Sequence, residues 1–421
     1  MLLGCIADDL TGATDLALTL TRGGMRTVQV MSALRGEMEV EHFDAVVVAQ
    51  RSRTIPAADA IAMTLESADA LLECDARQLF FKYCSTFDST DTGNIGPVAD
   101  ALLDLLGEEF TIACPAFPTN KRTIYMGNLF VGELLLAESP MKDHPLTPMR
   151  DSNLVRVLQR QSRRRVGLIP LAVVDRGSAE IRNAFVRARS RHENYAIVDA
   201  ITDQNLLEIG RAAAGLRLIT GGSGVALGLP ENFRRQGHLK GATVQQSMPA
   251  PAGRAVILAG SCSEATRGQV RSAIEAGIPS IRIEPSRLAK DQDLVDDVCA
   301  WAMKQSANAP VLIYSSAEPA AVSAAQEILG IERAGELIED ALAAAAERLA
   351  EQGFTRIIVA GRETSGAVVK RLNIAALEIG PEIDPGVPWT RTVGDPHLAL
   401  ALKSGNFGGS EFFLKAWDRL S

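Results

Sequence analysis

The chain has 421 residues, 47% of them hydrophobic and 22% charged, which is the balance of a globular protein able to bury sizeable cores. Its 43 basic and 51 acidic side chains give a formal net charge of -8, which argues against a nucleic-acid partner because such partners usually require a basic face. The sequence shows neither a signal peptide nor an apolar run of membrane-spanning length, so we expect a cytoplasmic protein without a membrane partner.

Short apolar runs alternate with helix-length segments through the first half of the chain. Strands are predicted at residues 3–7, 27–31, 45–49, 79–83, 111–113, 195–198 and 216–220. Helices are predicted at residues 13–22, 57–72, 98–106 and 205–214. This order predicts a parallel sheet with helices on both faces. Residues 114–153, rich in Pro, Gly, Asn and Thr, interrupt the rhythm, and we predict an irregular segment there.

A polar stretch that contains Pro and Gly, residues 236–253, precedes a second series of the same kind. Strands are predicted at residues 255–259, 311–314 and 356–360, and helices at residues 265–276 and 336–352. We therefore predict an α/β protein of two domains, residues 1–238 and 254–421, joined by a linker at residues 239–253. Each domain is expected to be a largely parallel sheet flanked by helices.

An acidic loop follows the first predicted strand. Asp8 and Asp9 precede Thr11 and Gly12, just before a helix. Ligands of open α/β sheets bind beyond the carboxyl ends of the strands, and two carboxylates there can hold or deprotonate a hydroxyl group. The other interpretation is a helix cap made by one aspartate, with a solvated neighbour.

A second polar loop follows the strand at residues 79–83. It offers Lys82 as a cation, several hydroxyl groups that include Ser85 and Thr86, and Asn94 near a helix start. This set suits a carboxylate or a sugar hydroxyl, although a plain turn rich in Ser and Thr would look the same. Arg51 and Arg53 follow a neighbouring strand, so at least one of them should open onto this edge.

Three loops of the predicted second domain combine glycine with hydroxyl or amide groups. Glycine and hydroxyl-bearing residues at a helix N-terminus make a phosphate cradle, and three such loops in one domain favour a nucleotide site over simple turns. The candidate nucleotide-binding residues are Ser261, Ser263, Thr266, Gly361, Arg362, Glu363, Thr364, Ser365, Gly405, Asn406, Phe407 and Gly408.

Three common motifs are absent from the sequence. It has no G-x-x-x-x-G-K-[ST] phosphate loop and no G-x-G-x-x-G after a strand. It also has no G-x-S-x-G nucleophile motif. The missing dinucleotide fingerprint disfavours an NAD-dependent sugar-acid oxidoreductase. A non-catalytic sugar-acid sensor is disfavoured because it would leave the three glycine-containing loops without a role.

Six segments, in order along nearly the whole chain, resemble the four-carbon acid sugar kinase family. They are IADDLTGATD at residues 6–15, KYCSTFDSTDTGNIGP at 82–97, ITGGSG at 219–224, AGSCSEAT at 259–266, GRETSG at 361–366 and ALKSGNFG at 401–408. The segments GNIGP and IGPEIDPGVPWT, the latter at residues 379–390, resemble the 3-oxo-tetronate kinases within that family. The D-threonate/D-erythronate 4-kinases of the same family are the alternative.

The resemblance implies ATP-dependent phosphorylation of the C4 hydroxyl of a 3-oxo-tetronate, in a cleft between an acid-sugar domain and a nucleotide domain. Mg²⁺ is expected as Mg-ATP, with Asp8 or Glu363 as outer ligands. By resemblance, Ser261, Ser263, residues 361–364 and Gly405 bind ATP. By resemblance, the acid-sugar site comprises Asp8, Asp9, Arg51, Lys82, Ser85 and Thr86. The sequence leaves open which aspartate is the base, the stereochemistry of the sugar acid, and whether the protein is a homodimer.

One position departs from the family pattern. The family usually has Gly-Gly-Glu-Thr-Ser-Gly where this chain has Arg362 as the second residue. If that position required a positive φ, arginine would cost about 1 kcal/mol or more. The alternative is an ordinary backbone there, with a side chain that reaches a phosphate.

Overall fold

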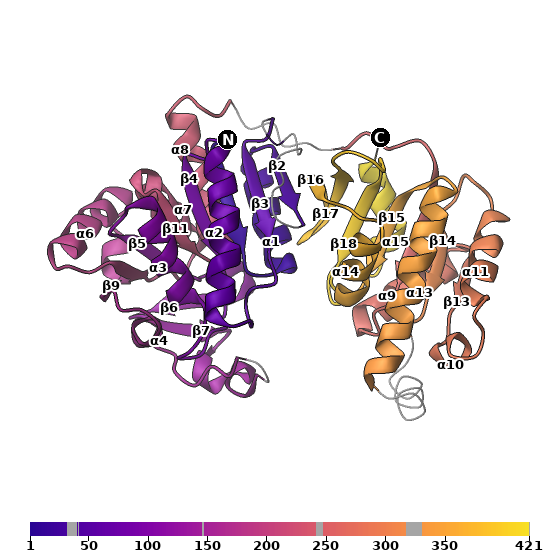
Figure 1. The fold of residues 1–421 in the computed structure, drawn as a ribbon, viewed down its shortest axis with the longest axis horizontal. Coiled ribbons are helices and arrows are strands. Elements are labelled where there is room, and N and C mark those ends of the chain that lie inside the picture. The colour runs from indigo at the N-terminus through magenta and orange to yellow at the C-terminus, as the bar shows by residue number, and fades with distance from the viewer. Residues whose placement is uncertain (32–39, 41, 145–146, 241–246, 317–330, 421) are drawn as a thin grey trace. The chain divides into compact units, whose positions relative to one another are not determined.

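The computed structural model describes residues 1–31, 40, 42–144, 147–240, 247–316 and 331–420. The chain divides into two compact units, Met1–Val244 and Gln245–Ser421 (Figure 1). Part of the predicted linker, residues 241–246, lies outside the described residues. Both units are α/β, as predicted. No helix in the described ranges is long and apolar enough to cross a membrane.

The first unit is built on a parallel sheet. In spatial order its strands are β2, β3, β1, β4, β11, β5, β10 and β9. Their bounds are β1 Leu3–Ala7, β2 Thr27–Val30, β3 Ala45–Ala49, β4 Gln78–Lys82, β5 Thr111–Cys114, β9 Val166–Ile169, β10 Tyr195–Val198 and β11 Leu218–Gly221. Most of these strands are buried along their whole length, as expected for a parallel sheet covered on both faces.

Two helical layers accompany this sheet. Helices α2, α3 and α4 pack in succession, and α1, α7 and α6 form a second series with a 3-10 segment, η5, between α1 and α7. The helix bounds are α1 Leu10–Arg22, α2 Ala57–Glu73, α3 Ile95–Leu106, α4 Leu154–Gln161, α5 Leu171–Val174, α6 Ser178–Ser190, α7 Asp203–Ala212 and α8 Leu229–Arg235. The 3-10 segments are η1 Pro118–Asn120, η2 Leu136–Glu138, η3 Pro140–Asp143, η4 Ala213–Gly215 and η5 Ser223–Gly228.

The segment predicted to be irregular contains a small antiparallel sheet, so that prediction is wrong. Its strands are β6 Arg122–Tyr125, β7 Asn128–Val131 and β8 Leu134–Leu135. The two-residue turn between β6 and β7 is Met126-Gly127, both with positive φ, which matches the twist of a hairpin. The buried carboxylate of Asp199 accepts hydrogen bonds from both turn amides, at 2.8 and 2.9 Å. The hydrogen bonds from this hairpin to Asp199, which is distant in the sequence, therefore stabilise a turn that the local sequence pattern does not predict.

The second unit has a mixed sheet. In spatial order its strands are β13, β14, β12, β15, β18, β17 and β16; the first five are parallel, and β17 is antiparallel to both of its neighbours. The strand bounds are β12 Arg254–Ala259, β13 Ser280–Arg282, β14 Val311–Tyr314, β15 Phe354–Ala360, β16 Ala376–Asp384, β17 Val387–Thr392 and β18 Ala399–Lys403. Pro381 and Pro388 lie at register irregularities of the β16–β17 pair, since proline cannot donate to the ladder.

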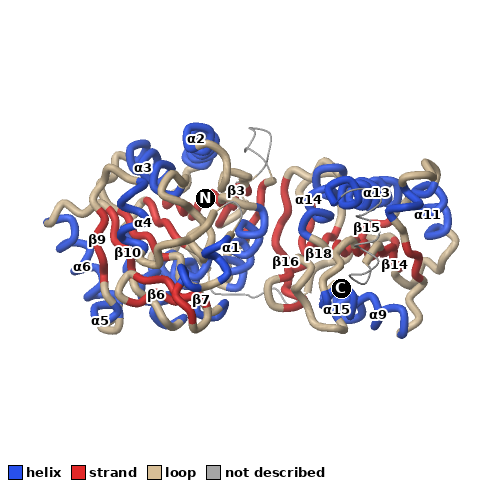
Figure 2. Tube along the Cα trace, turned by 90° about the horizontal axis from the view of Figure 1, so that it is seen from below, coloured by secondary structure: helices blue, strands red, loops and turns tan. Residues whose placement is uncertain are grey.

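Helices cover both faces of this second sheet. Figure 2 shows α11, α13 and α14 along one face and α9 and α15 along the other. The bounds are α9 Glu264–Glu275, α10 Pro285–Leu288, α11 Leu294–Met303, α13 Ile331–Glu351, α14 Arg362–Arg371, α15 Phe412–Lys415 and the 3-10 segment η6 Ala416–Arg419.

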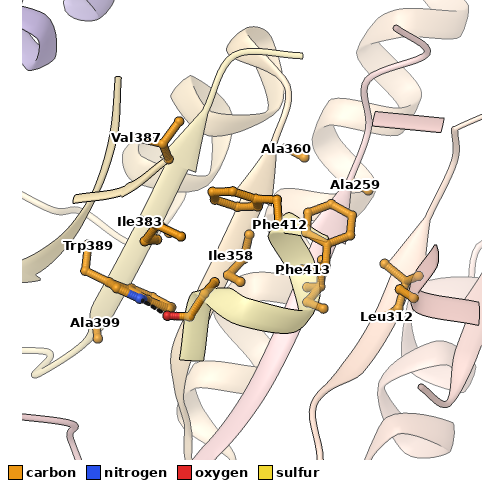
Figure 3. Packing of buried hydrophobic residues seen from close by; sticks show 14 of the residues in the cluster. Ala259, Leu312, Ile358, Ala360, Ile383, Val387, Trp389, Ala399, Phe412 and Phe413 are labelled. Carbon is orange, nitrogen blue, oxygen red and sulfur yellow. Dashed lines mark hydrogen bonds between the residues drawn. The ribbon is translucent and has the colours of Figure 1, made fainter. Parts of the chain in front are cut away.

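A hydrophobic cluster fixes the end of the chain against the sheet. Trp389, Phe412 and Phe413 are fully buried among aliphatic side chains of β12, β15 and β18 (Figure 3). The indole Nε1 of Trp389 donates a hydrogen bond of 2.7 Å to the carbonyl of Ala416, so the one polar group of this ring is satisfied. The packing of α15 anchors one end of the loop that follows β18.

Candidate functional site

The acidic loop lies at the switch point of the first sheet. After the central strand β1, the chain forms β2 and β3 on one side of β1 and then β4 on its other side. Such a reversal opens a crevice at the carboxyl ends of the two central strands. Asp8 and Asp9 follow β1, while Lys82 ends β4, and the Asp8 amide donates to the Lys82 carbonyl at 3.0 Å. The two polar loops predicted from the sequence are therefore neighbours.

Arg53 pairs with the first aspartate. Its Nε and Nη2 atoms donate to the two carboxylate oxygens of Asp8 at 2.9 and 2.8 Å, a two-point interaction that fixes both groups. The same guanidinium lies 3.0 Å from Asp9 Oδ1 and 3.7 Å from Asp88 Oδ2. One cation thus gathers three carboxylates that come from two loops.

The second aspartate caps helix α1. Asp9 Oδ1 accepts a hydrogen bond of 2.8 Å from the Gly12 amide, so the capping interpretation holds for this residue. The Asp9 side chain is 26% exposed, against 7% for Asp8. Capping uses only one carboxylate oxygen, and Asp9 is the more accessible of the pair. The cap and a catalytic role are compatible in this geometry.

Lys82 approaches the same loop from β4. A Cβ atom on Gly12 would lie 2.3 Å from Lys82 Nζ and 2.4 Å from Asp9 Oδ1. Any side chain at position 12 would therefore require Lys82 or Asp9 to shift. The nearly buried Lys82 places a second cation beside the aspartates.

Burial shapes the charges of this cluster. It raises the pKa of Asp8, while the Arg53 hydrogen bonds and the charges of Arg53 and Lys82 act in the opposite direction. Burial also raises the pKa of Asp15, which lies within α1, while the charge of Lys82 acts to lower it. Burial alone would lower the pKa of Arg53, but its contacts with Asp8 and Asp9 raise it above the ordinary range. Arg53 is therefore permanently charged. Asp15, which was not among the predicted site residues, belongs to the same electrostatic environment.

The loop after β4 is internally bonded. The Thr86 hydroxyl donates to Asp88 and lies 2.9 Å from Cys84 Sγ, so this buried hydroxyl faces its own loop. Phe87 holds a positive φ of 51°, which closes the turn. Ser85 is half-buried, as is Thr11 on α1. Of the predicted hydroxyl groups, these two are the more accessible.

Asn94 is directed toward the protein backbone. Its amide nitrogen donates to the carbonyls of Ser52, Arg53 and Ile55 at 2.7, 3.3 and 2.9 Å. The residue therefore holds the loop that carries Arg53, and acts on the site through that loop.

The two arginines after β3 have different positions. Arg53 lies in the carboxylate cluster, whereas Arg51, the one predicted to bind substrate, is exposed. The amide of Ser52 between them bonds to the Asp8 carbonyl at 3.1 Å, which keeps this loop beside β1. The sequence placed both arginines at the right sheet edge but did not distinguish their environments.

The predicted nucleotide loops lie at the switch point of the second sheet. From β12 the chain moves to β13 and β14 on one side and then to β15 and β18 on the other. The loops after β12, β15 and β18 therefore emerge from the carboxyl ends of three adjacent parallel strands. The Ser261 amide donates to the carbonyl of Ala360 at 3.1 Å, and the Gly361 amide to that of Lys403 at 2.9 Å. These hydrogen bonds connect the three loops to one another.

Gly405, in the loop after β18, contacts the loop after β12. Its carbonyl accepts hydrogen bonds from the hydroxyls of Ser263 and Thr266 at 2.7 and 2.8 Å. A Cβ atom on Gly405 would lie 2.2 Å from the Ser261 hydroxyl oxygen, so a side chain there would require Ser261 or the loop to shift. Ser263 also caps α9 by accepting from the Thr266 amide. The backbone of the last loop is thus held directly against the N-terminus of α9.

Arg362, where the family usually has glycine, does not carry the unusual backbone conformation of this loop, because that conformation lies at Gly361. Gly361 has a φ of 137°, a conformation that L side chains rarely adopt, while Arg362 is the first residue of α14 and has a negative φ. The alternative of a required positive φ at Arg362 is therefore excluded. The side chains of Arg362 and Glu363 are exposed at the start of the helix, whereas Thr364 is buried beneath the loops.

The remaining predicted nucleotide residues differ in exposure. Asn406 and Phe407 are exposed, and the Phe407 ring lies against the turn at Gly386. Gly408 has a positive φ, and its carbonyl accepts from Gln269 at 2.9 Å. Ser365 is buried, and its hydroxyl has no hydrogen-bond partner among the residues that the structure describes.

The residues of these loops have the chemical groups needed to bind a nucleoside triphosphate. The second unit offers loop amides, hydroxyl groups and two helix N-termini, the groups that bind phosphate oxygens. In the described part of the chain, no group of three or more His, Cys, Asp or Glu side chains is arranged to hold a metal ion. The predicted cleft between the two domains stays a prediction.

Comparisons with known proteins divide the chain in a similar way. A family model described as a sugar-binding N-terminal domain matches residues 3–229. A second model, described as a nucleotide-binding C-terminal domain, matches residues 256–413. The acidic cluster lies in the first match and the three glycine-containing loops lie in the second.

Full-length relatives share about half of their residues with this chain. A protein of Burkholderia multivorans named 3-oxo-tetronate kinase is 55% identical over 415 residues, covering 99% of this chain and 96% of its own length. A protein of Cupriavidus necator with the same name is 54% identical over 421 residues, covering 100% of this chain and 97% of its own length.

A solved structure has the same fold over the whole chain. The crystal structure of a protein from Salmonella typhimurium LT2 is 41% identical, with a TM-score of 0.92 that covers 100% of this chain and 99% of that one. That protein carries the provisional name of a tRNA synthase, which the kinase relatives do not share. The resemblance seen in the sequence is confirmed by the two family models and the full-length relatives: the chain belongs to the four-carbon acid sugar kinase family.

Proposed function

We propose that this protein is a 3-oxo-tetronate kinase, which transfers the γ-phosphate of ATP to the C4 hydroxyl of a 3-oxo-tetronate and yields the 4-phosphate. The observation that carries the proposal is the presence of two switch-point sites of different chemistry in one chain. One combines carboxylates with buried cations, and the other combines glycines with hydroxyl groups. The names of full-length relatives at 54% and 55% identity support the substrate.

The acid sugar is proposed to bind in the unit that contains Asp8. A four-carbon sugar acid carries one carboxylate and several hydroxyl groups, which suit cations and carboxylates respectively. Lys82 and Arg51 are the cations proposed to bind the substrate carboxylate, since Arg53 already faces three protein carboxylates. Thr11 and Ser85 are half-buried at the same loops and can bind hydroxyl groups.

Asp9 is the proposed general base. It is more exposed than Asp8, and one of its oxygens remains available after capping α1. A carboxylate within reach of the C4 hydroxyl can orient it and accept its proton while it attacks the γ-phosphate in line. Asp8 is held on both oxygens by Arg53, which suits a role in fixing the cluster.

The three loops of the second unit are proposed to bind the triphosphate. Phosphoryl transfer needs alignment and neutralisation of charge more than covalent chemistry from the protein. Amides near Ser261 and Gly361 and the loop around Gly405 are the proposed donors. Mg²⁺ would enter as Mg-ATP and neutralise phosphate charge. Arg362, exposed at the start of α14, is proposed to extend toward a phosphate.

Analysis of the product tests this proposal. Purified protein is incubated with Mg-ATP and a 3-oxo-tetronate, and the product is examined by mass spectrometry and phosphorus NMR. The expected product is a phosphate monoester coupled to the two protons of C4, formed together with one ADP. Oxidation of NADH by the 3-oxo-tetronate in a parallel incubation without ATP, or ligand binding without release of ADP, would contradict the proposal.

A further inference from the structure

Lys403, the last residue of β18, is a buried lysine beneath the nucleotide loops. Its side chain is almost completely inaccessible. The ammonium donates to the Thr266 hydroxyl at 3.0 Å and to the carbonyls of Ser404 and Gly405, each at 3.2 Å. All three acceptors are neutral and belong to the loops proposed to bind phosphate. Lysine is rarely this buried unless it is paired with an opposite charge.

No carboxylate of the described residues balances the charge of this ammonium. Within the described ranges, no ion pair includes Lys403. Burial lowers the pKa of Lys403 to about 8, and no charged neighbour contributes to the shift. The segments that adjoin it, the loop after β12 with the start of α9 and the start of α14, carry the titratable or charged residues Cys262, Glu264, Arg267, Arg362 and Glu363. A buried positive charge with neutral partners is costly in the empty protein and is stabilised when an anion binds nearby.

We propose that Lys403 is a positioning residue of the nucleotide site, whose ammonium locks the loop at Gly405 against α9 and gives that loop a positive charge matched to the phosphates. This inference rests on the proposed nucleotide binding of the second unit. It adds a function to a residue that lies under the loops and does not itself contact the ligand.

A proton should accompany the nucleotide. Binding of an anion beside Lys403 favours its charged form, so the pKa rises from about 8 toward the ordinary lysine value of 10.5. At pH 8 about half of the lysines in the empty protein are neutral, and binding should take up close to half a proton per nucleotide. Between pH 8 and the raised pKa, nucleotide affinity should fall by up to about tenfold per pH unit.

Calorimetric titration with ADP tests this inference. Wild type, Lys403→Met, Lys403→Arg and, as a control, Lys370→Met are compared in buffers of different ionisation enthalpy between pH 7 and 9.5. Lys370 is exposed near the end of α14. We expect Lys403→Met to bind ADP about tenfold or more weakly at pH 7.5, without proton uptake and without a lower melting temperature. Lys403→Arg keeps the charge but does not titrate, so its affinity should be independent of pH in this range.

The possible outcomes distinguish a failure of the proposed function from a failure of the role proposed for Lys403. Wild-type protein that binds neither ADP nor ATP would overturn the proposed function itself. Wild-type protein that binds ADP without taking up a proton at pH 8 would overturn only the role of Lys403. Unchanged proton uptake in Lys403→Met would do the same, as would a Lys403→Met variant that loses stability but keeps its affinity. These readouts remain decisive even if the arginine variant fails to fold, because the wild-type measurement does not depend on it.

Discussion

The guanidinium of Arg53 binds both carboxylate oxygens of Asp8, at 2.8 and 2.9 Å, at the switch point of the first sheet. The same guanidinium lies 3.0 Å from Asp9. Arg53 thereby determines where both aspartates lie. The site is consequently sensitive to changes in a residue that need not contact the substrate.

Replacing Arg53 by alanine should impair folding as well as activity. Asp8 would remain as a buried carboxylate without its main partner, and breaking such a pair typically costs about 3–5 kcal/mol. Thermal unfolding should show a clear loss of stability. Arg51→Ala is the matched control two residues away, because that side chain is exposed.

Arg51→Ala should leave the melting temperature unchanged and raise the KM for the acid sugar. A rise in the KM for ATP alone would contradict the assignment of the acid sugar to the first unit. Equal melting temperatures for the two arginine variants would show that the pair with Asp8 contributes little to stability.

Asp9→Asn should reduce kcat by about 10²–10⁴-fold, the usual contribution of a positioned base. Asparagine caps helices as well as aspartate does, so α1 should stay intact and the variant should melt near the wild-type temperature. Steady-state kinetics and thermal unfolding check both parts. Asp8→Asn is the companion variant and should lose stability through its weakened pair with Arg53. If both variants kept turnover within a few-fold of wild type, neither aspartate would be the base.

Gly405→Ala should raise the KM for ATP by at least about tenfold, which corresponds to ~1.4 kcal/mol. The added methyl group would lie 2.2 Å from the Ser261 hydroxyl oxygen and 3.0 Å from that of Ser263, so these serine side chains or the loop must shift. Gly268→Ala on α9 is the control, since a Cβ atom there meets nothing within 4 Å. That control should keep wild-type kinetics and gain ~0.5–1 kcal/mol of stability. Similar ATP kinetics in both variants would remove the loop from the nucleotide site.

Cys84 should resist alkylation at neutral pH. Burial and the nearby Asp88 carboxylate raise the pKa of this thiol to about 11. The thiol is protonated below that pH, and the thiolate is the reactive form. Peptide mass spectrometry after iodoacetamide treatment should show little modification of Cys84 at pH 7.5, with a rate that rises about tenfold per pH unit up to pH 9.5. Rapid modification at pH 7.5 would contradict a protonated thiol with a raised pKa.

The strands were predictable because short apolar runs mark the buried strands of a parallel sheet. β1, β3 and β10 have the predicted bounds, and the loops predicted to carry chemistry do follow strand ends. The order of the strands, which brings those loops to two switch points, depends on long-range pairing that no local pattern contains.

The distinction between Arg51 and Arg53 was not predictable for the same reason. The path of their loop is set by Asn94, which lies some forty residues further along the chain and binds three of its carbonyls. Lys403 lies in the segment at residues 401–408 that the sequence pointed to, but its burial was not predictable, because a lysine at a strand end is expected to reach solvent. In both cases tertiary contacts decide the environment of a charged side chain.

An ADP-release assay with a panel of substrates tests the central claim most directly. The panel contains the D and L forms of 3-oxo-tetronate together with D-threonate and D-erythronate, each with Mg-ATP. We expect ADP release with a 3-oxo-tetronate and little or none with the two reduced acids. Release of ADP with D-threonate alone would contradict the substrate while leaving a kinase in place, and no release with any of the acids would contradict the kinase itself.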